Sequence, residues 1–268
     1  MLLAALLLAL PATAAEGLRL DGPLIQGGLV RGTAAPGASV RLDGRPVRVS
    51  PGGAFVIGFG RDAPGRARLE VTWPDGGREI RGLDIAPRRY RIQRVDGLPP
   101  GLVSPRPEDL ARIRREAALA AAARRRDDRR TDFLEPFVWP ARGPITGVYG
   151  SQRVLNGKPG RPHFGIDIAA PAGTPVVAPA AGVVSLAHPD MFFSGATLFL
   201  DHGHGLSSAF LHLEKILVRQ GQRVAQGQPI ATVGASGRVT GAHLDWRLNW
   251  FQTRLDPGLV VGPMPAGP

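Results

Sequence analysis

Residues 163–177 read HFGIDIAAPAGTPVV, and this stretch decides how the rest of the chain is interpreted. His163 and Asp167 lie four residues apart, and the alanine, proline and glycine residues that follow predict a turn leading into a strand. Imidazole nitrogen and carboxylate oxygen are a common ligand set for catalytic zinc, which keeps one coordination position open for water. A single pair of this kind is a weak motif. It gains weight from two histidines and an aspartate within residues 212–245.

The composition excludes several classes of site. The 268 residues leave room for one large or two modest domains, and 36 Gly and 26 Pro predict many turns. The chain has no cysteine, so disulfides and thiolate metal sites are excluded, and any metal must be held by His, Asp or Glu. The net charge of +11 comes almost entirely from arginine. It suits a polyanionic partner such as nucleic acid, a membrane surface or an anionic cell-wall polymer, or it is simply a solvated basic surface.

Residues 1–15 are apolar and end in small residues, as the hydrophobic region and cleavage site of a secretory signal peptide do. The positively charged start of such a peptide is missing, and the alternative is a buried N-terminal strand or helix. No cysteine follows that could carry a lipid anchor, and no other stretch is long and apolar enough to cross a bilayer. We therefore expect an exported, periplasmic protein without stable membrane insertion.

Residues 16–97 alternate short strand patterns with Gly and Pro turns, which predicts a small β-sandwich. Part of this region resembles bacterial immunoglobulin-like modules, and it contains no catalytic set. Its expected role is spacing, docking or shielding, or else it only stabilises the chain. The expected strands are residues 29–32, 39–42, 47–49, 54–57 and 67–73.

Residues 98–132 predict a linker that contains a basic helix. A Pro- and Gly-rich start leads to Pro107, where acidic residues follow in the first helical turn and are favoured by the helix dipole. An alanine-rich run ends in the arginines of residues 124–130. The helix is either a basic strut that meets an anionic polymer or a solvated connector. It lacks the interleaved aromatic residues of single-strand binders, and we expect no nucleic-acid partner.

Residues 133–260 carry the chemistry and are followed by a short tail, residues 261–268. This region contains an internal echo: residues 173–184 parallel residues 221–234, each with a glycine, a small strand, a turn and a second small strand. Such an echo predicts two similar β-hairpin units packed face to face.

The order of these motifs resembles the lysostaphin/LytM-type zinc metallopeptidases, which cut peptide cross-links of bacterial peptidoglycan. The likeness covers residues 139–257. It implies a mainly β chain whose C-terminal part is an antiparallel β metallopeptidase core with a duplicated hybrid motif, holding one Zn²⁺. It further implies that His163 and Asp167 are metal ligands, and that His212 and His243 are catalytic residues beside the metal.

Asp245 departs from the pattern of the family, in which a histidine is the third zinc ligand. Residues two apart on a strand point to the same face, so Asp245 faces the site if His243 does. A carboxylate can ligate zinc, so we expect Asp245 to be the third ligand. One histidine and two carboxylates bring a dication to formal neutrality, which should make it a weaker Lewis acid. The alternatives are a hydrogen-bond acceptor for another ligand or a structural cap.

Other polar residues have weaker assignments. Arg153 is a candidate for binding a substrate carboxylate, or a surface residue. His202 and His204 lie in a Gly-rich hairpin turn and are expected to be structural.

The predicted function is that of an exported zinc metalloendopeptidase acting on the peptide cross-links or stem peptides of peptidoglycan. The alternative is a catalytically degenerate relative that binds peptidoglycan or activates a cell-wall amidase. A lipoyl or biotinyl carrier needs a lysine at a hairpin tip, and neither Lys158 nor Lys215 lies in such a turn. Cell-division or wall-synthesis proteins are possible partners of the N-terminal module.

Overall fold

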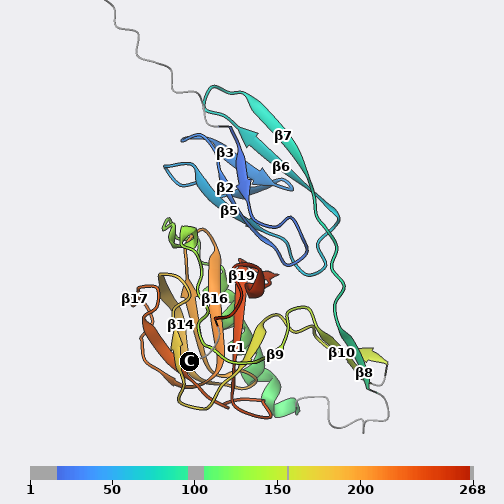
Figure 1. Ribbon diagram of the computed structural model, residues 1–268, viewed down its shortest axis with the longest axis vertical. Helices are drawn as coiled ribbons and strands as arrows, with labels where there is room; N and C mark the ends of the chain where they lie inside the picture. The colour runs from blue at the N-terminus through green and yellow to red at the C-terminus, as the bar shows by residue number, and fades with distance from the viewer. Residues whose placement is uncertain (1–16, 96–105, 156, 266–268) are drawn as a thin grey trace, which may run out of the picture.

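The computed structural model describes residues 17–95, 106–155 and 157–265 (Figure 1). The predicted signal peptide at residues 1–15, part of the predicted linker and the last residues of the tail lie outside the described residues. The described part of the chain is mainly β with one α-helix, which confirms the predicted fold class. It contains no helix that is long and apolar enough to span a bilayer.

The N-terminal domain is a sandwich of two antiparallel sheets. One sheet has the order β1-β2-β5 and the other β4-β3-β6-β7. Alternation explains these strands: in β6 the inward residues Ala67, Leu69 and Val71 are buried, while their neighbours are exposed or half-buried. The strands are β1 (Arg19–Asp21), β2 (Leu29–Thr33), β3 (Ser39–Leu42), β4 (Arg45–Val47), β5 (Ala54–Gly58), β6 (Arg66–Thr72) and β7 (Arg78–Asp84).

The sandwich docks directly on the C-terminal domain through its β1-β2-β5 sheet (Figure 1). Leu29 and Val56 belong to the buried core of the C-terminal domain. The Arg31 Nε donates a hydrogen bond to the carbonyl of Phe133 over 2.8 Å. Since an apolar contact and a hydrogen bond to backbone cross the same boundary, this sheet is held in a defined position.

The chain then leaves the sandwich and joins the other domain. Strand β8 (Ile92–Val95) pairs in parallel with β10 (Gln152–Leu155), and β10 pairs with β11 (Lys158–Pro159). This three-stranded sheet lies beside the main body of the C-terminal domain (Figure 1).

The C-terminal domain is built on a 10-stranded sheet whose main order is β17-β14-β15-β16-β19-β12-β9. The two echoing segments exchange strands: β13 pairs with β18, and β14 pairs with β17. The strands are β9 (Ile145–Gly147), β12 (Ile166–Ala169), β13 (Pro175–Val177), β14 (Gly182–Met191), β15 (Gly195–Asp201), β16 (Leu206–Ile216), β17 (Arg223–Val224), β18 (Pro229–Val233), β19 (His243–Trp250) and β20 (Thr253–Leu255).

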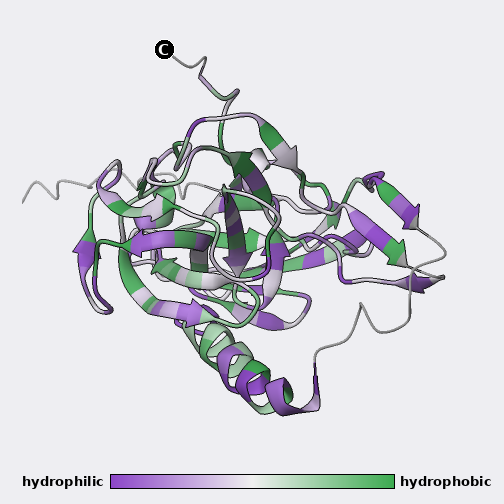
Figure 2. Cartoon of the chain, turned by 90° about the horizontal axis from the view of Figure 1, so that it is seen from below, coloured by the Kyte–Doolittle hydropathy of each residue, from purple (hydrophilic) through white to green (hydrophobic). Residues whose placement is uncertain are grey.

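The helix α1 (Leu110–Arg124) follows a single 3₁₀ turn, η2 (Pro107–Asp109), as predicted from the proline and acidic residues. Further 3₁₀ turns are η3 (Asp132–Leu134) and η4 (Pro257–Leu259). Ala120 and Ala123 let α1 approach the face of β14, β15 and β16 closely. In Figure 2 the helix carries hydrophobic and hydrophilic bands along the outside of the sheet. Its last residue, Arg124, is buried against this face.

Gly32 tests the packing of the sandwich. A Cβ at residue 32 would lie 2.0 Å from the ring of Phe55, which is fully buried. We expect Gly32→Ala to lower the free energy of unfolding by about 1–3 kcal/mol, because the ring must move out of a close-packed core. Gly82→Ala, on the exposed face of β7 with nothing within 4 Å of the added Cβ, is the matched control. Urea denaturation measures both, and equal midpoints for the two variants would contradict this account of the core.

Candidate metal centre

Strands β12 and β19 bring the two aspartates together. Their antiparallel register places Asp167 directly opposite Asp245. Like charges opposite each other in a sheet destabilise it unless a cation lies between them. The pair of aspartates therefore needs a positively charged group close to it.

His163 completes a three-residue cluster. Its backbone N–H donates to the carbonyl of Ser151 and its carbonyl accepts from the N–H of Gly150, both over 2.8 Å, so the residue is fixed just before β12. Its Nε2 lies 3.2 Å from Asp167 Oδ1, within ion-pair distance, and neither of these two buried atoms has an aligned hydrogen bond. One ligand atom each from His163, Asp167 and Asp245 lies within 4.8 Å of the others.

Two glycines allow this close approach. A Cβ at Gly147 would lie 2.1 Å from Asp167 Oδ2, and one at Gly165 would lie 2.3 Å from Asp245 Oδ1. Side chains at either position would push a carboxylate out of the cluster. The glycines are therefore part of the cradle that holds the two aspartates.

The electrostatics of the cluster favour a cation. Burial disfavours the charged imidazole of His163, but the Asp167 and Asp245 carboxylates outweigh it and raise its pKa. Buried polar atoms normally form hydrogen bonds, and a buried imidazole nitrogen beside a buried carboxylate oxygen, neither with an aligned hydrogen bond, is the arrangement expected of zinc ligands. Zinc ligands at about 2.0–2.2 Å lie roughly 3.4 Å apart in a tetrahedral site. His163 Nε2 and Asp167 Oδ1, at 3.2 Å, are already this close, and all three candidate ligand atoms lie within 4.8 Å of one another. The donor set fits zinc.

Arg247 is a further member of the site that the sequence analysis missed. Its Nε donates to Asp245 Oδ1 over 2.9 Å and its Nη2 to Oδ2 over 2.6 Å. Burial raises the pKa of a carboxyl group, but the Arg247 charge outweighs it, and the pKa of Asp245 is lowered. A carboxylate has about four lone-pair sites, so Asp245 can accept from Arg247 and still ligate a metal.

The Asp245–Arg247 pair is neutral as a whole. With His163 neutral and Asp167 charged, a bound dication would leave the site at a formal charge of plus one. The expected loss of Lewis acidity, based on one histidine and two carboxylates, is therefore offset by Arg247. The signal was present in the sequence, because Arg247 is two residues after Asp245 on the same strand face.

His212 and His243 lie beside the cluster, and a backbone carbonyl fixes the orientation of each ring. The Nδ1 of His212 lies 2.9 Å from the carbonyl of Ser236, and the Nδ1 of His243 lies 2.9 Å from that of Gly241. A carbonyl only accepts, so each Nδ1 carries the proton and each Nε2 keeps a lone pair. The His243 Nε2 is 3.9 Å from Asp167 Oδ1, and the two rings lie 5.0 Å apart.

His212 has two properties typical of a functional residue. Its φ is 62°, in the left-handed region that non-glycine residues seldom adopt outside strained sites. Burial lowers its pKa, so the ring is neutral at neutral pH. The strained backbone is held by the hydrogen bond from His212 N–H to the Ser194 carbonyl over 2.8 Å.

The remaining predicted residues lie elsewhere. Arg153 is exposed on β10, in the small sheet, and does not line the cavity that contains His212. His202 is fully buried, with Nδ1 2.7 Å from the Ala181 carbonyl and Nε2 2.8 Å from Ser208 Oγ, as expected of a structural residue. His204 is also buried, with Nδ1 3.1 Å from the carbonyl of Arg48.

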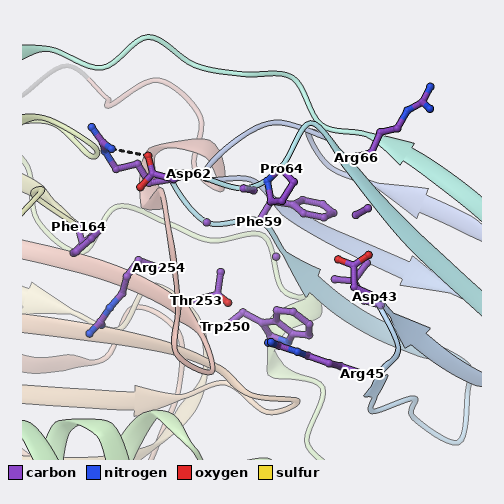
Figure 3. A pocket seen from close by; sticks show the side chains of 16 residues that line it. Asp43, Arg45, Phe59, Asp62, Pro64, Arg66, Phe164, Trp250, Thr253 and Arg254 are labelled. Atoms are coloured by element: carbon purple, nitrogen blue, oxygen red, sulfur yellow. Dashed lines mark hydrogen bonds and ion pairs between the residues drawn. The ribbon is translucent and has the colours of Figure 1, made fainter.

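Two cavities adjoin this part of the molecule. One, of about 420 Å³, lies between α1 and the sheet and contains His212 and Arg247. The other, of about 500 Å³, lies between the two domains and is lined by Trp250, Phe59 and several arginines (Figure 3). None of the candidate ligands lines either cavity, and the first adjoins the metal centre through Arg247, the partner of Asp245, and through His212.

Charge compensation by Arg247 can be tested by metal binding. Asp245→His alone leaves the guanidinium without its carboxylate beside a dication, and we expect zinc affinity to fall on the order of 10- to 100-fold. Adding Arg247→Gln to that variant removes the uncompensated charge and should restore affinity. Competition with a chromophoric zinc chelator measures both. Tighter zinc binding by Asp245→His than by the wild-type chain would refute the compensation.

The raised pKa of His163 predicts how zinc binding depends on pH. The charged imidazole stabilises the metal-free fold below 6.5, and this contribution is lost as pH rises through the raised pKa. Zinc needs the neutral ring, so protons compete with the metal, and affinity should fall as pH is lowered through a value above 6.5. Chelator competition from weakly acidic to neutral pH checks this, and a flat profile would contradict it.

Comparisons with known proteins agree with this geometry. The sequence pattern of peptidase family M23 matches residues 161–257, which include every candidate ligand and both histidines. A putative peptidase M23 from Pseudomonas aeruginosa, known from its crystal structure, is 34% identical, with 89% of this chain and 95% of that chain covered and a TM-score of 0.70.

Two curated relatives match over shorter stretches. The peptidoglycan DD-endopeptidase ShyA of Vibrio cholerae is 45% identical over 89 residues, 32% of this chain and 20% of ShyA. The cell division protein DipM of Caulobacter vibrioides is 32% identical over 127 residues, 47% of this chain and 20% of DipM. The matched part thus spans about a fifth of these relatives. Because the Pseudomonas structure corresponds along nearly its whole length and the family pattern covers the complete candidate centre, the chain belongs to peptidase family M23.

Proposed function

We propose that the chain is an exported zinc metalloendopeptidase that hydrolyses peptide cross-links or stem peptides of bacterial peptidoglycan. The observation that carries the proposal is the cluster of one ligand atom each from His163, Asp167 and Asp245 within 4.8 Å of one another, beside two histidines that are oriented through their Nδ1 atoms. Membership of family M23 and the name of ShyA, a peptidoglycan endopeptidase, support the substrate class.

In this proposal His163, Asp167 and Asp245 hold the zinc. When bound, zinc supplies the Lewis acidity that amide hydrolysis needs. Arg247 keeps Asp245 oriented by its two-pronged contact and limits the negative charge at the centre.

His212 and His243 handle the proton and the developing charge. The neutral His212 ring, whose Nδ1–H is fixed to the Ser236 carbonyl, accepts a proton at Nε2 from the attacking water and passes it to the leaving amine. His243, oriented through the Gly241 carbonyl, stabilises the tetrahedral oxyanion from the other side. The site thus has one base that is uncharged at neutral pH and a second imidazole 5.0 Å away.

A catalytically degenerate peptidoglycan-binding protein, or an activator of a cell-wall amidase, is the second candidate. One observation favours it: Arg247 already gives Asp245 a cationic partner, so this carboxylate needs no metal. This alternative does not explain why His163 Nε2 and Asp167 Oδ1 are buried without an aligned hydrogen bond. The enzyme accounts for both, so we rank it first.

Location and partners follow from the proposed substrate. The apolar start of the sequence and the proposed substrate both support a periplasmic location. The sandwich uses the β1-β2-β5 sheet to dock on the catalytic domain, so the β4-β3-β6-β7 sheet is left for cell-division or wall-synthesis proteins (Figure 1). The name of DipM, a cell division protein, supports this class of partner.

Three single substitutions test the proposed activity. We expect Asp167→Ala to lose both zinc and peptidoglycan cleavage, because a ligand is removed. His212→Ala should keep zinc but lose about 10²- to 10⁴-fold in rate, the usual contribution of a general acid–base residue. His188→Ala is the control, because this half-buried histidine of β14 lies outside the site. Metal analysis and chromatography of released muropeptides provide the measurements.

The two candidate functions differ in their outcomes. Peptidoglycan cleavage that depends on Asp167 and His212 establishes the enzyme. A wild-type chain that holds no zinc, releases no muropeptide and stimulates a separate amidase establishes the degenerate alternative.

A further inference from the structure

We propose that Arg124, Arg161 and Arg254 form a carboxylate-binding subsite beside His212, which takes a free carboxylate of the peptide substrate. The inference rests on the proposed function, because it names a feature of the substrate that this function would act on.

The subsite lies in the cavity of about 420 Å³ between α1 and the sheet. Arg124 enters from the end of α1, Arg254 from β20 and Arg161 from the loop before β12, and His212 lines the same cavity. Arg254 lines both this cavity and the cavity between the domains, and Figure 3 shows its guanidinium directed away from Thr253 and Trp250. Three segments that are distant in the sequence therefore each contribute an arginine to the cavity that His212 lines.

These cations lack anionic partners. Among the residues that the structure describes, Arg124, Arg161 and Arg254 make no ion pair. The Nε of Arg124 donates to Gln252 Oε1 over 3.1 Å, and Arg254 donates to Asn249 Oδ1, which are both neutral groups. Arg161 lies over the ring of Phe164 at 5.8 Å.

The nearby carboxylates are already used. Glu116 is the acidic residue among the described residues of the cavity wall. Its Oε1 accepts from Arg112 Nε and its Oε2 from the N–H of Phe192, both over 2.7 Å. Asp245 is occupied by Arg247. The cavity thus holds excess positive charge that its own walls do not neutralise.

This charge is costly to the free protein. Arg124 is only 8% exposed. Burial and the charges of Arg161 and Arg247 lower the pKa of Arg124 to about 10, and burial with the charges of Arg124 and Arg247 lowers that of Arg254 to about 9. Both remain charged at neutral pH. Groups that repel one another in a partly desolvated space are stabilised by an anion placed among them.

A carboxylate is the anion that fits best. The planar guanidinium group binds carboxylates through two parallel hydrogen bonds. The cavity also has apolar walls, including Ala117, Ala120 and Leu211, which suit a small side chain next to the carboxylate. Because His212 lines the same cavity, the carboxylate must belong to the molecule being cleaved and lie close to its scissile amide.

A matched pair of substrates tests the subsite with the zinc-loaded full chain. One is a cross-linked stem-peptide dimer with free carboxylates, and the other is the same dimer with its carboxylates converted to amides. We expect kcat/KM to be roughly 10- to 100-fold higher for the free acid, the range that charge-assisted hydrogen bonds provide. Arg124→Gln and Arg254→Gln should each reduce this preference, mainly by raising KM for the free acid.

Arg125→Gln is the matched control, because it removes the same charge one residue along, at an exposed position outside the cavity. It should keep the preference. Equal kcat/KM for the two dimers in the wild-type chain would overturn the subsite while leaving the proposed function intact. An equal loss in Arg125→Gln would also overturn it, because a general effect of charge would then explain the result.

A binding measurement separates the two proposals. Calorimetry with the Asp167→Ala chain, which is not expected to cleave, compares the acid and amide dimers directly. If the wild-type chain cleaves neither dimer, the proposed function is wrong, and this preference alone decides the subsite. The subsite is overturned if the chain binds the acid and amide dimers equally and inorganic phosphate displaces neither dimer. Phosphate binding without a preference for the acid dimer assigns the cluster to another anion and overturns it too.

Discussion

The placement of Asp167 opposite Asp245 is the constraint on which the rest of the centre depends. Two carboxylates facing each other across paired strands repel, and the surrounding protein provides several means of balancing them. His163 lies within ion-pair distance of Asp167, and Arg247 pairs with Asp245. Each neighbouring feature either supplies positive charge or makes room for the two carboxylates.

The two aspartates lie on paired strands of the main sheet. β19 lies between β16 and β12 in the middle of the sheet, so both aspartates stand on fully paired backbone. Trp246, next to Asp245, is fully buried in the core beneath the site. The two histidines, in contrast, are oriented by loop carbonyls, those of Ser236 and Gly241. The two candidate ligands Asp167 and Asp245 thus stand on paired strands, while the side chains of the candidate catalytic histidines are oriented by loop carbonyls.

Local patterns in the sequence predicted the elements well. Alternation identified β2, β3, β5 and β6, placed β4 two residues too late, and did not identify β1 and β7. The proline and acidic residues identified the start of α1. The echo identified two related segments, but the prediction of two separate hairpin units was wrong, because the strands of each segment pair with those of the other. The grouping of His163, Asp167 and Asp245 was predicted from a family resemblance, and the structure brings these residues together. Arg247 was predictable from the strand period but was overlooked. Arg124 and Arg254 were not predictable, because they come from α1 and β20, and only tertiary packing decides that such segments meet. Arg153 was a candidate for binding a substrate carboxylate or a surface residue, and in the structure it is exposed on β10 and does not line the cavity that contains His212.

The register of β12 and β19 also bears on when the centre comes into existence. Asp167 and Asp245 are 78 positions apart in the chain. The strands between β12 and β19 must form before these two strands can pair. The hairpin units exchange strands, so neither unit completes its sheet without the other. Pairing of this long range forms late and slowly in folding. A chain that is still being synthesised, or one kept unfolded for transport, therefore cannot assemble the ligand cluster. The topology itself delays the appearance of the candidate metal centre until the whole domain has folded.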